Sequence, residues 1–284
     1  MAKIKATVHG AVSLVNAIAT QKGATLGIAL KVEAIVETSP GKGITIQSEN
    51  KTLSSRLINK TVEKIIPKKE LDQNKITITL NSEIPTGYGL KSSSAISSAI
   101  ALACAKIFKP KLTDQQILLA GVDASIESKV SITGAYDDAC SCYYGGFNVT
   151  DNAKKKRIHF EKGPTNLIAA IFIPKNRKRG NLKNLKVLST VFENAWELAR
   201  KANYWEAMNI NGLATALILN SDPKIITTLI EKGALGASVS GNGPAIAAIT
   251  KKENELNIKK IFSTLEGSII ISKISNKKAE VHEL

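Results

Sequence analysis

Hydrophobic and polar residues follow two periods along this chain, one typical of strands and one of helices. Strict alternation over Lys75 to Leu80 predicts a strand, and the spacing over Leu53 to Ile66 predicts a helix that stops at Pro67. Apolar positions of helical spacing predict further helices at Ser92 to Ile107, Thr113 to Ser128, Leu185 to Ala202, Trp205 to Leu219 and Pro223 to Lys232. The first of these has a stripe of small and branched residues that indicates a core-facing side.

Short apolar or β-branched runs predict the remaining strands. They lie at Lys3 to Val8, Thr25 to Val36, Gly43 to Ser48, Gly146 to Thr150, Arg157 to Phe160, Leu167 to Ile173, Gly236 to Ser240, Ala245 to Thr250, Ser268 to Ile274 and Ala279 to Leu284. Strands and helices mixed in this way, with several hairpins, favour an α+β fold over a doubly wound parallel sheet. We expect two lobes, residues 1–152 and residues 153–284.

The composition changes this picture little. No apolar run reaches the roughly 18 residues that cross a bilayer, and Met1 to Val8 lacks the apolar block of a signal peptide. We therefore expect a cytoplasmic protein without a membrane partner. The cysteines (Cys104, Cys140 and Cys142) have no C-x-x-C spacing, and the three histidines are scattered, so a Cys/His metal centre is not predicted.

The net charge of +15 indicates an affinity for anions. The basic residues are spread along the chain, with dense clusters at Lys154 to Arg157 and Lys175 to Arg179. Aromatic residues make up 5% of the chain and none interleave with these clusters, which favours solvated loops or hairpins over a base-stacking platform. Nucleic-acid binding remains an alternative that only the charge supports, and we expect no nucleic-acid partner.

A glycine-rich stretch lies between the predicted strand at Lys75 to Leu80 and the helix that begins at Ser92. It consists of Pro85, Thr86, Gly87, Tyr88, Gly89, Leu90, Lys91, Ser92, Ser93, Ser94 and Ala95. A glycine turn that leads into a helix collects unpaired N–H groups at the positive end of the helix dipole, which suits a phosphate. The serine hydroxyls can donate to phosphate oxygens, and Lys91 adds a positive charge.

Two other interpretations of this stretch are a Walker A loop and a turn without a ligand. Leu90 excludes a Walker A loop, because that motif requires a glycine before Lys-Ser. A Pro-Gly turn followed by a serine N-cap would need no ligand.

The pattern Pro85-x-Gly87-x-Gly89-Leu90-x-Ser92-Ser93 resembles the second motif of the GHMP kinases, the superfamily of galactokinase, homoserine kinase and mevalonate kinase. Gly236 to Ala245 resembles the third motif of the family, and Gly134 to Gly146 resembles its aspartate segment. The resemblance implies a two-lobed fold, with an N-terminal lobe like domain 2 of ribosomal protein S5 and a ferredoxin-like C-terminal lobe. It also implies ATP and Mg²⁺ as cofactors and a small-molecule substrate.

The resemblance assigns roles to individual residues. Asp138 lies seven residues before Gly145, the position of the catalytic aspartate in mevalonate kinases, and Glu127 lies eleven residues before Asp138, the position of a metal ligand. Ser93 matches the serine ligand of Mg²⁺. Whether Asp138 removes a proton or stabilises the transition state stays open. Asp137 could instead cap a helix, and Glu127 could be an exposed helix-end carboxylate.

The stretch Gly10 to Ala24 departs from the first motif of mevalonate kinases and galactokinases, which contains a Gly-Glu-His run. Together with Gly89 to Ala95 and Gly134 to Cys140, it resembles the archaeal-type shikimate kinases. This implies phosphorylation of shikimate to shikimate 3-phosphate in chorismate and aromatic amino acid biosynthesis; another GHMP kinase, such as homoserine kinase, is the nearest alternative.

Shikimate has a carboxylate that requires a basic partner. The candidates are Lys22, Lys175, Arg177, Lys178 and Arg179. Other candidate substrate residues are Asn16, Asp137, Gly241, Asn242 and Gly243.

Overall fold

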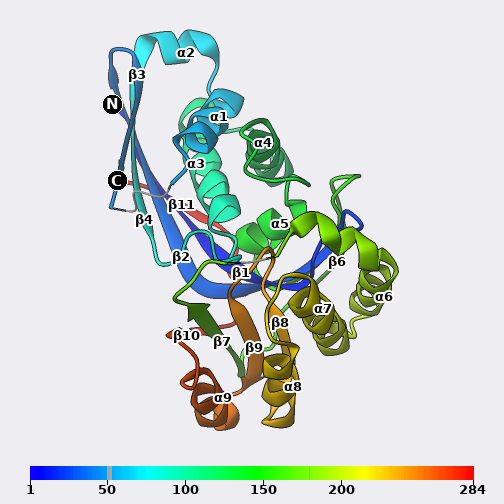
Figure 1. Ribbon diagram of the computed structural model, residues 1–284. Helices are drawn as coiled ribbons and strands as arrows, with labels where there is room; N and C mark the ends of the chain where they lie inside the picture. The colour runs from blue at the N-terminus through cyan, green and yellow to red at the C-terminus, as the bar shows by residue number, and fades with distance from the viewer. Residues whose placement is uncertain (50–52, 179) are drawn as a thin grey trace.

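The computed structural model describes residues 1–49, 53–178 and 180–284, and these form two sheets with helices packed against them (Figure 1). The first sheet has the strand order β11-β1-β2-β4-β3; β5 pairs with β2 on the same edge as β4, at the other end of the strand, and β6 pairs with β5. Its strands are β1 (Lys3–Val15), β2 (Lys22–Pro40), β3 (Gly43–Ser48), β4 (Asn74–Ser82), β5 (Phe147–Asp151), β6 (Lys156–Glu161) and β11 (Glu280–Glu283). Neighbouring strands are antiparallel, except that β3 and β4 run parallel.

The long strand β2 holds the first sheet together because its two halves have different partners. Residues 22–26 pair with β5, and residues 32–40 pair with β4, while β1 runs along most of its length. The pairing register of β1 shifts at His9/Gly10 and Ser13/Val15, and irregularities of this kind bend a strand. Both strands are longer than predicted, and the bent end of β1 reaches the middle of the molecule (Figure 1).

Helices of the first half cover the first sheet. They are α1 (Ser55–Ile65), α2 (Lys68–Gln73), α3 (Ser92–Phe108), α4 (Asp114–Glu127) and α5 (Tyr136–Tyr144). Helix α3 is buried on every side from Ser94 to Ala105, because it lies between the sheet and helices α1, α4 and α5. A capping box begins α4, since the Thr113 side chain accepts from the Gln116 N–H and Gln116 Oε1 accepts from the Thr113 N–H.

The second sheet has the strand order β10-β7-β9-β8, with all pairs antiparallel. Its strands are β7 (Leu167–Pro174), β8 (Ala234–Val239), β9 (Ile246–Lys251) and β10 (Gly267–Lys273). Between β7 and β8 come η1 (Leu182–Leu188), α6 (Ser189–Arg200), α7 (Tyr204–Ile218) and α8 (Pro223–Glu231), and between β9 and β10 come η2 (Lys252–Asn254) and α9 (Glu255–Phe262). Helices and strands in this β-α-β-β-α-β order make a ferredoxin-like unit.

The α+β fold with two sheets is therefore confirmed. Strands β6 and β11 lie beyond residue 152 and yet pair in the first sheet. The division at that residue stays a prediction.

The cysteines are free and buried, and burial raises the pKa of Cys104 to about 12. Lys154 to Arg157 lie at the β5–β6 hairpin, where Lys155 pairs with Asp123 at 2.5 Å. Aromatic rings do accompany this cluster, because Arg157 lies over the rings of Tyr144 and Phe160. Within the described part of the chain, no helix combines the length and the hydropathy that a membrane span requires.

Candidate functional site

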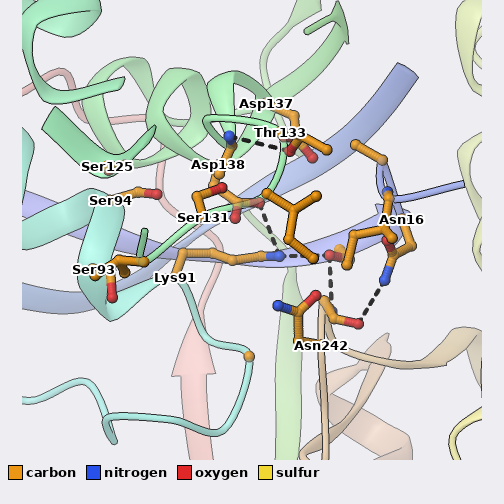
Figure 2. A pocket seen from close by; sticks show the side chains of 18 of the residues that line it. Asn16, Lys91, Ser93, Ser94, Ser125, Ser131, Thr133, Asp137, Asp138 and Asn242 are labelled. Carbon is orange, nitrogen blue, oxygen red and sulfur yellow. Dashed lines mark hydrogen bonds and ion pairs between the residues drawn. The ribbon is translucent and has the colours of Figure 1, made fainter. Parts of the chain in front are cut away.

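A cavity of about 230 Å³ lies where four distant segments of the chain meet. Figure 2 shows the segments: the end of β1, the glycine loop before α3, the start of α5 and the loop between β8 and β9. Many predicted site residues line it, namely Asn16, Gly87, Gly89, Lys91, Ser92, Ser93, Ser94, Asp137, Asp138, Gly241 and Asn242. Ser13, Ser125, Val130, Ser131, Ile132 and Thr133 also line it.

The glycine loop adopts a conformation that requires its glycines. Gly87 and Gly89 have φ of +84° and +85°, a region that residues with a side chain avoid. At Gly89 a Cβ atom would lie 1.9 Å from the Ser240 carbonyl oxygen, so the two glycine loops are in backbone contact. Gly89 O accepts from Ser240 Oγ at 2.9 Å, which ties the loops together.

The start of α3 is open to a ligand. Its N-cap residue is Lys91, with φ of +67° and no side-chain cap bond, so the interpretation as a serine N-cap is wrong. Ser92, Ser93 and Ser94 form the first turn, whose N–H groups have no partner within the helix. These N–H groups, the hydroxyls and the helix dipole together suit an anion at this wall of the cavity.

Two adjacent aspartates form the opposite wall. Helix α5 begins after Ala135 at the N-cap, so Asp137 is not the cap residue. Asp138 Oδ1 lies 2.8 Å from Lys91 Nζ, and Asp137 Oδ1 accepts from Asn152 Nδ2 at 2.7 Å. Burial and, second, the neighbouring Asp138 carboxylate raise the pKa of Asp137 to about 7.

The end of β1 joins the other segments through buried polar contacts. Ser13 Oγ accepts from Lys91 Nζ at 2.7 Å and from the Gly241 N–H at 2.9 Å. Asn16 Nδ2 donates to Gly241 O at 2.7 Å, and the Asn16 N–H donates to Asn211 Oδ1 at 2.8 Å. The predicted substrate residues Asn16 and Gly241 are thus brought together.

Sequence reasoning missed Ser13, Asn152 and Asn211. Ser13 lies in an apolar run, Asn211 lies on a mixed helix and Asn152 lies in a polar turn, so no local pattern could have identified them.

Two predicted residues are not brought to the cavity. The Glu127 carboxylate, at the end of α4, pairs with Lys64 of α1 and does not line the cavity; its side chain is 44% exposed. Lys22 pairs with Glu193 and lies over the ring of Trp196 at 4.7 Å from its centroid, again away from the cavity lining.

The remaining predicted residues lie around the cavity, in the core, or outside the described residues. In the basic stretch after β7, Arg177 lies over the Tyr88 ring at 4.8 Å, which places it against the glycine loop, while Arg179 lies outside the described residues. Leu90 and Ala95 are buried in the core and Gly243 turns the β8–β9 loop with φ of +63°. Pro85, Thr86 and Tyr88 belong to the glycine loop without lining the cavity.

A second, mainly apolar pocket of about 180 Å³ adjoins the first. Its lining residues are Leu53, Ser54, Leu57, Ile58, Thr86, Ser93, Ile96 and Val130. Ser93 and Val130 line both spaces, so the apolar pocket and the polar cavity share a wall at the start of α3.

Comparison with known proteins agrees with this architecture. A model of the GHMP kinases N terminal domain matches residues 56–146, and a model of the GHMP kinases C terminal domain matches residues 193–263. The fold is similar to a homoserine kinase from Cytophaga hutchinsonii (TM-score 0.77, 18% identity, 99% of this chain and 98% of that one). It is also similar to the mevalonate kinase of Methanococcus jannaschii (TM-score 0.71, 16% identity, 97% and 99%). Fold and site together define a GHMP kinase.

Curated relatives narrow the family further. A shikimate kinase from Methanosarcina acetivorans is 36% identical over 96% of this chain and 95% of its own length. A shikimate kinase from Methanothermobacter thermautotrophicus is 31% identical, and the match covers 100% of both chains. The chain belongs to the archaeal shikimate kinase family of the GHMP kinases, as its motifs predicted.

Proposed function

We propose that this protein transfers the γ-phosphoryl group of ATP to shikimate and forms shikimate 3-phosphate, a step toward chorismate and the aromatic amino acids. The observation that supports it most is the similarity to archaeal proteins named shikimate kinase, which extends through both lobes. The cavity supplies a phosphate wall and a carboxylate wall that face each other, as phosphoryl transfer requires.

The smaller pocket and the larger cavity together define how ATP would be oriented in the site. Leu57, Ile58 and Ile96 make the smaller pocket suitable for the flat, largely apolar adenine ring. The triphosphate then runs past Ser93, which lines both spaces, to the open start of α3. This arrangement places the γ-phosphate in the larger cavity.

The acceptor hydroxyl would lie next to Asp138. Its oxygen attacks the γ-phosphorus, the bond to the bridging oxygen of ADP breaks, and the hydroxyl proton passes to the Asp138 carboxylate. Asn16, Asp137 and Asn242 line the same cavity and offer polar groups to the other hydroxyls of the substrate. Among the described basic candidates for its carboxylate, Arg177 contacts the glycine loop that lines the cavity, at Gly87 and Tyr88.

The oxygen donors of the cavity fit Mg²⁺, a hard cation that proteins bind through one or two carboxylates together with substrate phosphates. Ser93 would hold it, and Glu127, the other predicted ligand, would have to leave Lys64 to join Ser93. The described residues contain no group of three His, Cys, Asp or Glu suited to a metal, so phosphate oxygens would supply further ligands. When bound, Mg²⁺ would neutralise phosphate charge.

The assay that tests the substrate is a coupled measurement of ADP release with MgATP and three acceptors: shikimate, homoserine and mevalonate. We expect turnover with shikimate well above turnover with the other two. Preferred turnover of homoserine or mevalonate would reject the proposed substrate and keep the kinase reaction.

Replacing Asp138 tests the mechanism. Asp138→Asn should lower kcat by about 10²- to 10⁴-fold, the usual effect of removing a general base, and should leave ATP binding intact. Asp123→Asn is the matched control, because Asp123 also pairs with a lysine, Lys155, but does not line the cavity. Near-normal turnover of Asp138→Asn would overturn the role of Asp138.

A further inference from the structure

Lys91 has a backbone conformation that a lysine does not favour. Its φ of +67° lies in the left-handed region, next to two glycines of the same loop that also have positive φ, Gly87 and Gly89. Glycine would adopt this conformation without steric cost, and the lysine side chain does not cap α3. A non-glycine residue held in this region is a reason to look for a function of its side chain.

The Lys91 side chain is buried inside the site. It is 5% exposed, and its ammonium lies 2.8 Å from Asp138 Oδ1 and 2.7 Å from Ser13 Oγ. Figure 2 shows the Lys91 side chain extended toward Asp138. Because a buried charge is costly unless it is paired, these two contacts fix the ammonium in one place. Ser13 Oγ also accepts from the Gly241 N–H, so the same hydroxyl positions the loop between β8 and β9.

That loop is shaped around the ammonium. Gly241 has φ of +54°, and a Cβ atom there would lie 2.6 Å from Lys91 Nζ. Among the described residues that line the cavity, Lys91 is the sole lysine, arginine or histidine. The ammonium therefore lies between the carboxylate wall and the phosphate wall, where negative charge develops during phosphoryl transfer.

We propose that Lys91 is a catalytic residue whose ammonium contacts the phosphoryl group in transfer, and that Ser13 is the residue that positions it. The proposal rests on the proposed kinase reaction and adds a role beyond nucleotide binding. As the acceptor oxygen bonds to the γ-phosphorus and the bridging oxygen leaves with ADP, Lys91 keeps its protons and stabilises the charge on the equatorial oxygens. It also keeps Asp138 aimed at the acceptor.

Lys91→Met removes the charge at similar length, and Lys91→Gly suits the positive φ and should fold normally. We expect kcat to fall by about 10²- to 10³-fold in both, as for loss of one transition-state donor, with ADP affinity little changed. Lys155→Gly is the matched control, because Lys155 also has a positive φ (+49°) and an aspartate partner, outside the cavity. It should keep normal turnover.

Chemical rescue distinguishes a catalytic charge from a structural one. Added n-butylammonium, which has the shape of the missing side chain, should restore part of the turnover of Lys91→Gly, and n-butanol should not. Ser13→Ala should lower kcat less than Lys91→Met, because in Ser13→Ala the Lys91 ammonium still pairs with Asp138. Loss of thermal stability and ADP affinity together with turnover, without rescue by the ammonium, would show a structural role and overturn the proposal.

A binding measurement keeps this test independent of the acceptor. The native chain should bind MgADP more tightly with aluminium fluoride, a mimic of the phosphoryl group in transfer, and Lys91→Met should lose this gain. If the native chain fails to phosphorylate shikimate but shows the gain, the proposed substrate is wrong and Lys91 keeps its role. If Lys91→Met retains the gain and the turnover, the proposal for Lys91 fails.

Discussion

Gly89 lies where the glycine loop before α3 crosses the loop between β8 and β9, and a single methyl group there should separate the two loops. A Cβ atom at Gly89 would lie 1.9 Å from the Ser240 carbonyl oxygen and 3.0 Å from the Gly243 nitrogen. Both atoms belong to the backbone, so they cannot rotate away as a side chain would. In Gly89→Ala one loop must move.

Two contributions set the magnitude. Holding alanine at a φ of +85° costs about 1 kcal/mol of stability, because its Cβ meets the backbone in left-handed conformations. Forcing a methyl group into a filled space typically costs a further 1–3 kcal/mol, roughly. We therefore expect a total of about 3 kcal/mol, which lowers Tm by roughly 6 to 12 °C in a chain of this size.

The control is Gly43→Ala, at the start of β3. Gly43 has a φ of +110°, and a Cβ atom there would meet nothing within 4 Å, so this variant has the backbone strain without the collision. Thermal unfolding of both variants and the kcat/KM for ATP are the measurements. Gly89→Ala should also lower kcat/KM for ATP by roughly 10- to 100-fold, because the phosphate cradle is displaced. Equal Tm losses in the two variants, with normal kinetics, would refute the reasoning.

Three further predictions concern single side chains. Ser93→Ala should raise the Mg²⁺ concentration needed for half-maximal turnover; Ser97→Ala, one turn later in α3 and outside the cavity lining, should not. Burial raises the pKa of Asp137 to about 7 from its ordinary 3.8, so the folded chain favours the protonated carboxyl. The contribution of this group to the free energy of unfolding is therefore full below about pH 4 and is lost as the pH rises through about 7. Asp137→Asn should therefore lose less Tm than the native chain between about pH 5 and about pH 8, and an unchanged slope would contradict this. Lys22→Ala should leave both substrate KM values nearly unchanged and cost about 0.2–1 kcal/mol, because Lys22 already pairs with Glu193 near the surface. A selective rise in the KM for shikimate would instead support a contact between Lys22 and the carboxylate.

The pattern of the sequence predicted the fold best where a segment has one buried and one exposed face. Lys75 to Leu80 alternates strictly and forms the middle of β4. The strand at Lys3 to Val8 was expected to end at Val8 but continues to Val15, because every residue from Val8 onward is buried and alternation disappears. The short helix α2 was not predicted, since none of its residues is buried and no apolar stripe indicates it.

The same reasoning explains what could be predicted of the site. Glycine loops are visible in a sequence because their backbone conformations require particular residues close together, and Gly87 and Gly89 indeed have positive φ. The contacts that join the loops are different. Ser13 meets Gly241 across 228 positions, and Asn16 meets Asn211 across 195. A lone serine or asparagine gives no sign of a partner that far along the chain.

The electrostatics of the cavity reconcile its two aspartates with two anionic substrates. Helices α3 and α5 both begin at the cavity, so two positive helix ends face it. The N-terminus of α5 has Asp137 and Asp138 in its first turn, while the N-terminus of α3 is left for phosphate. A net charge of +15 over the whole surface attracts small anions as well as it attracts nucleic acid. The overall charge therefore agrees with a kinase of ATP and a carboxylate substrate.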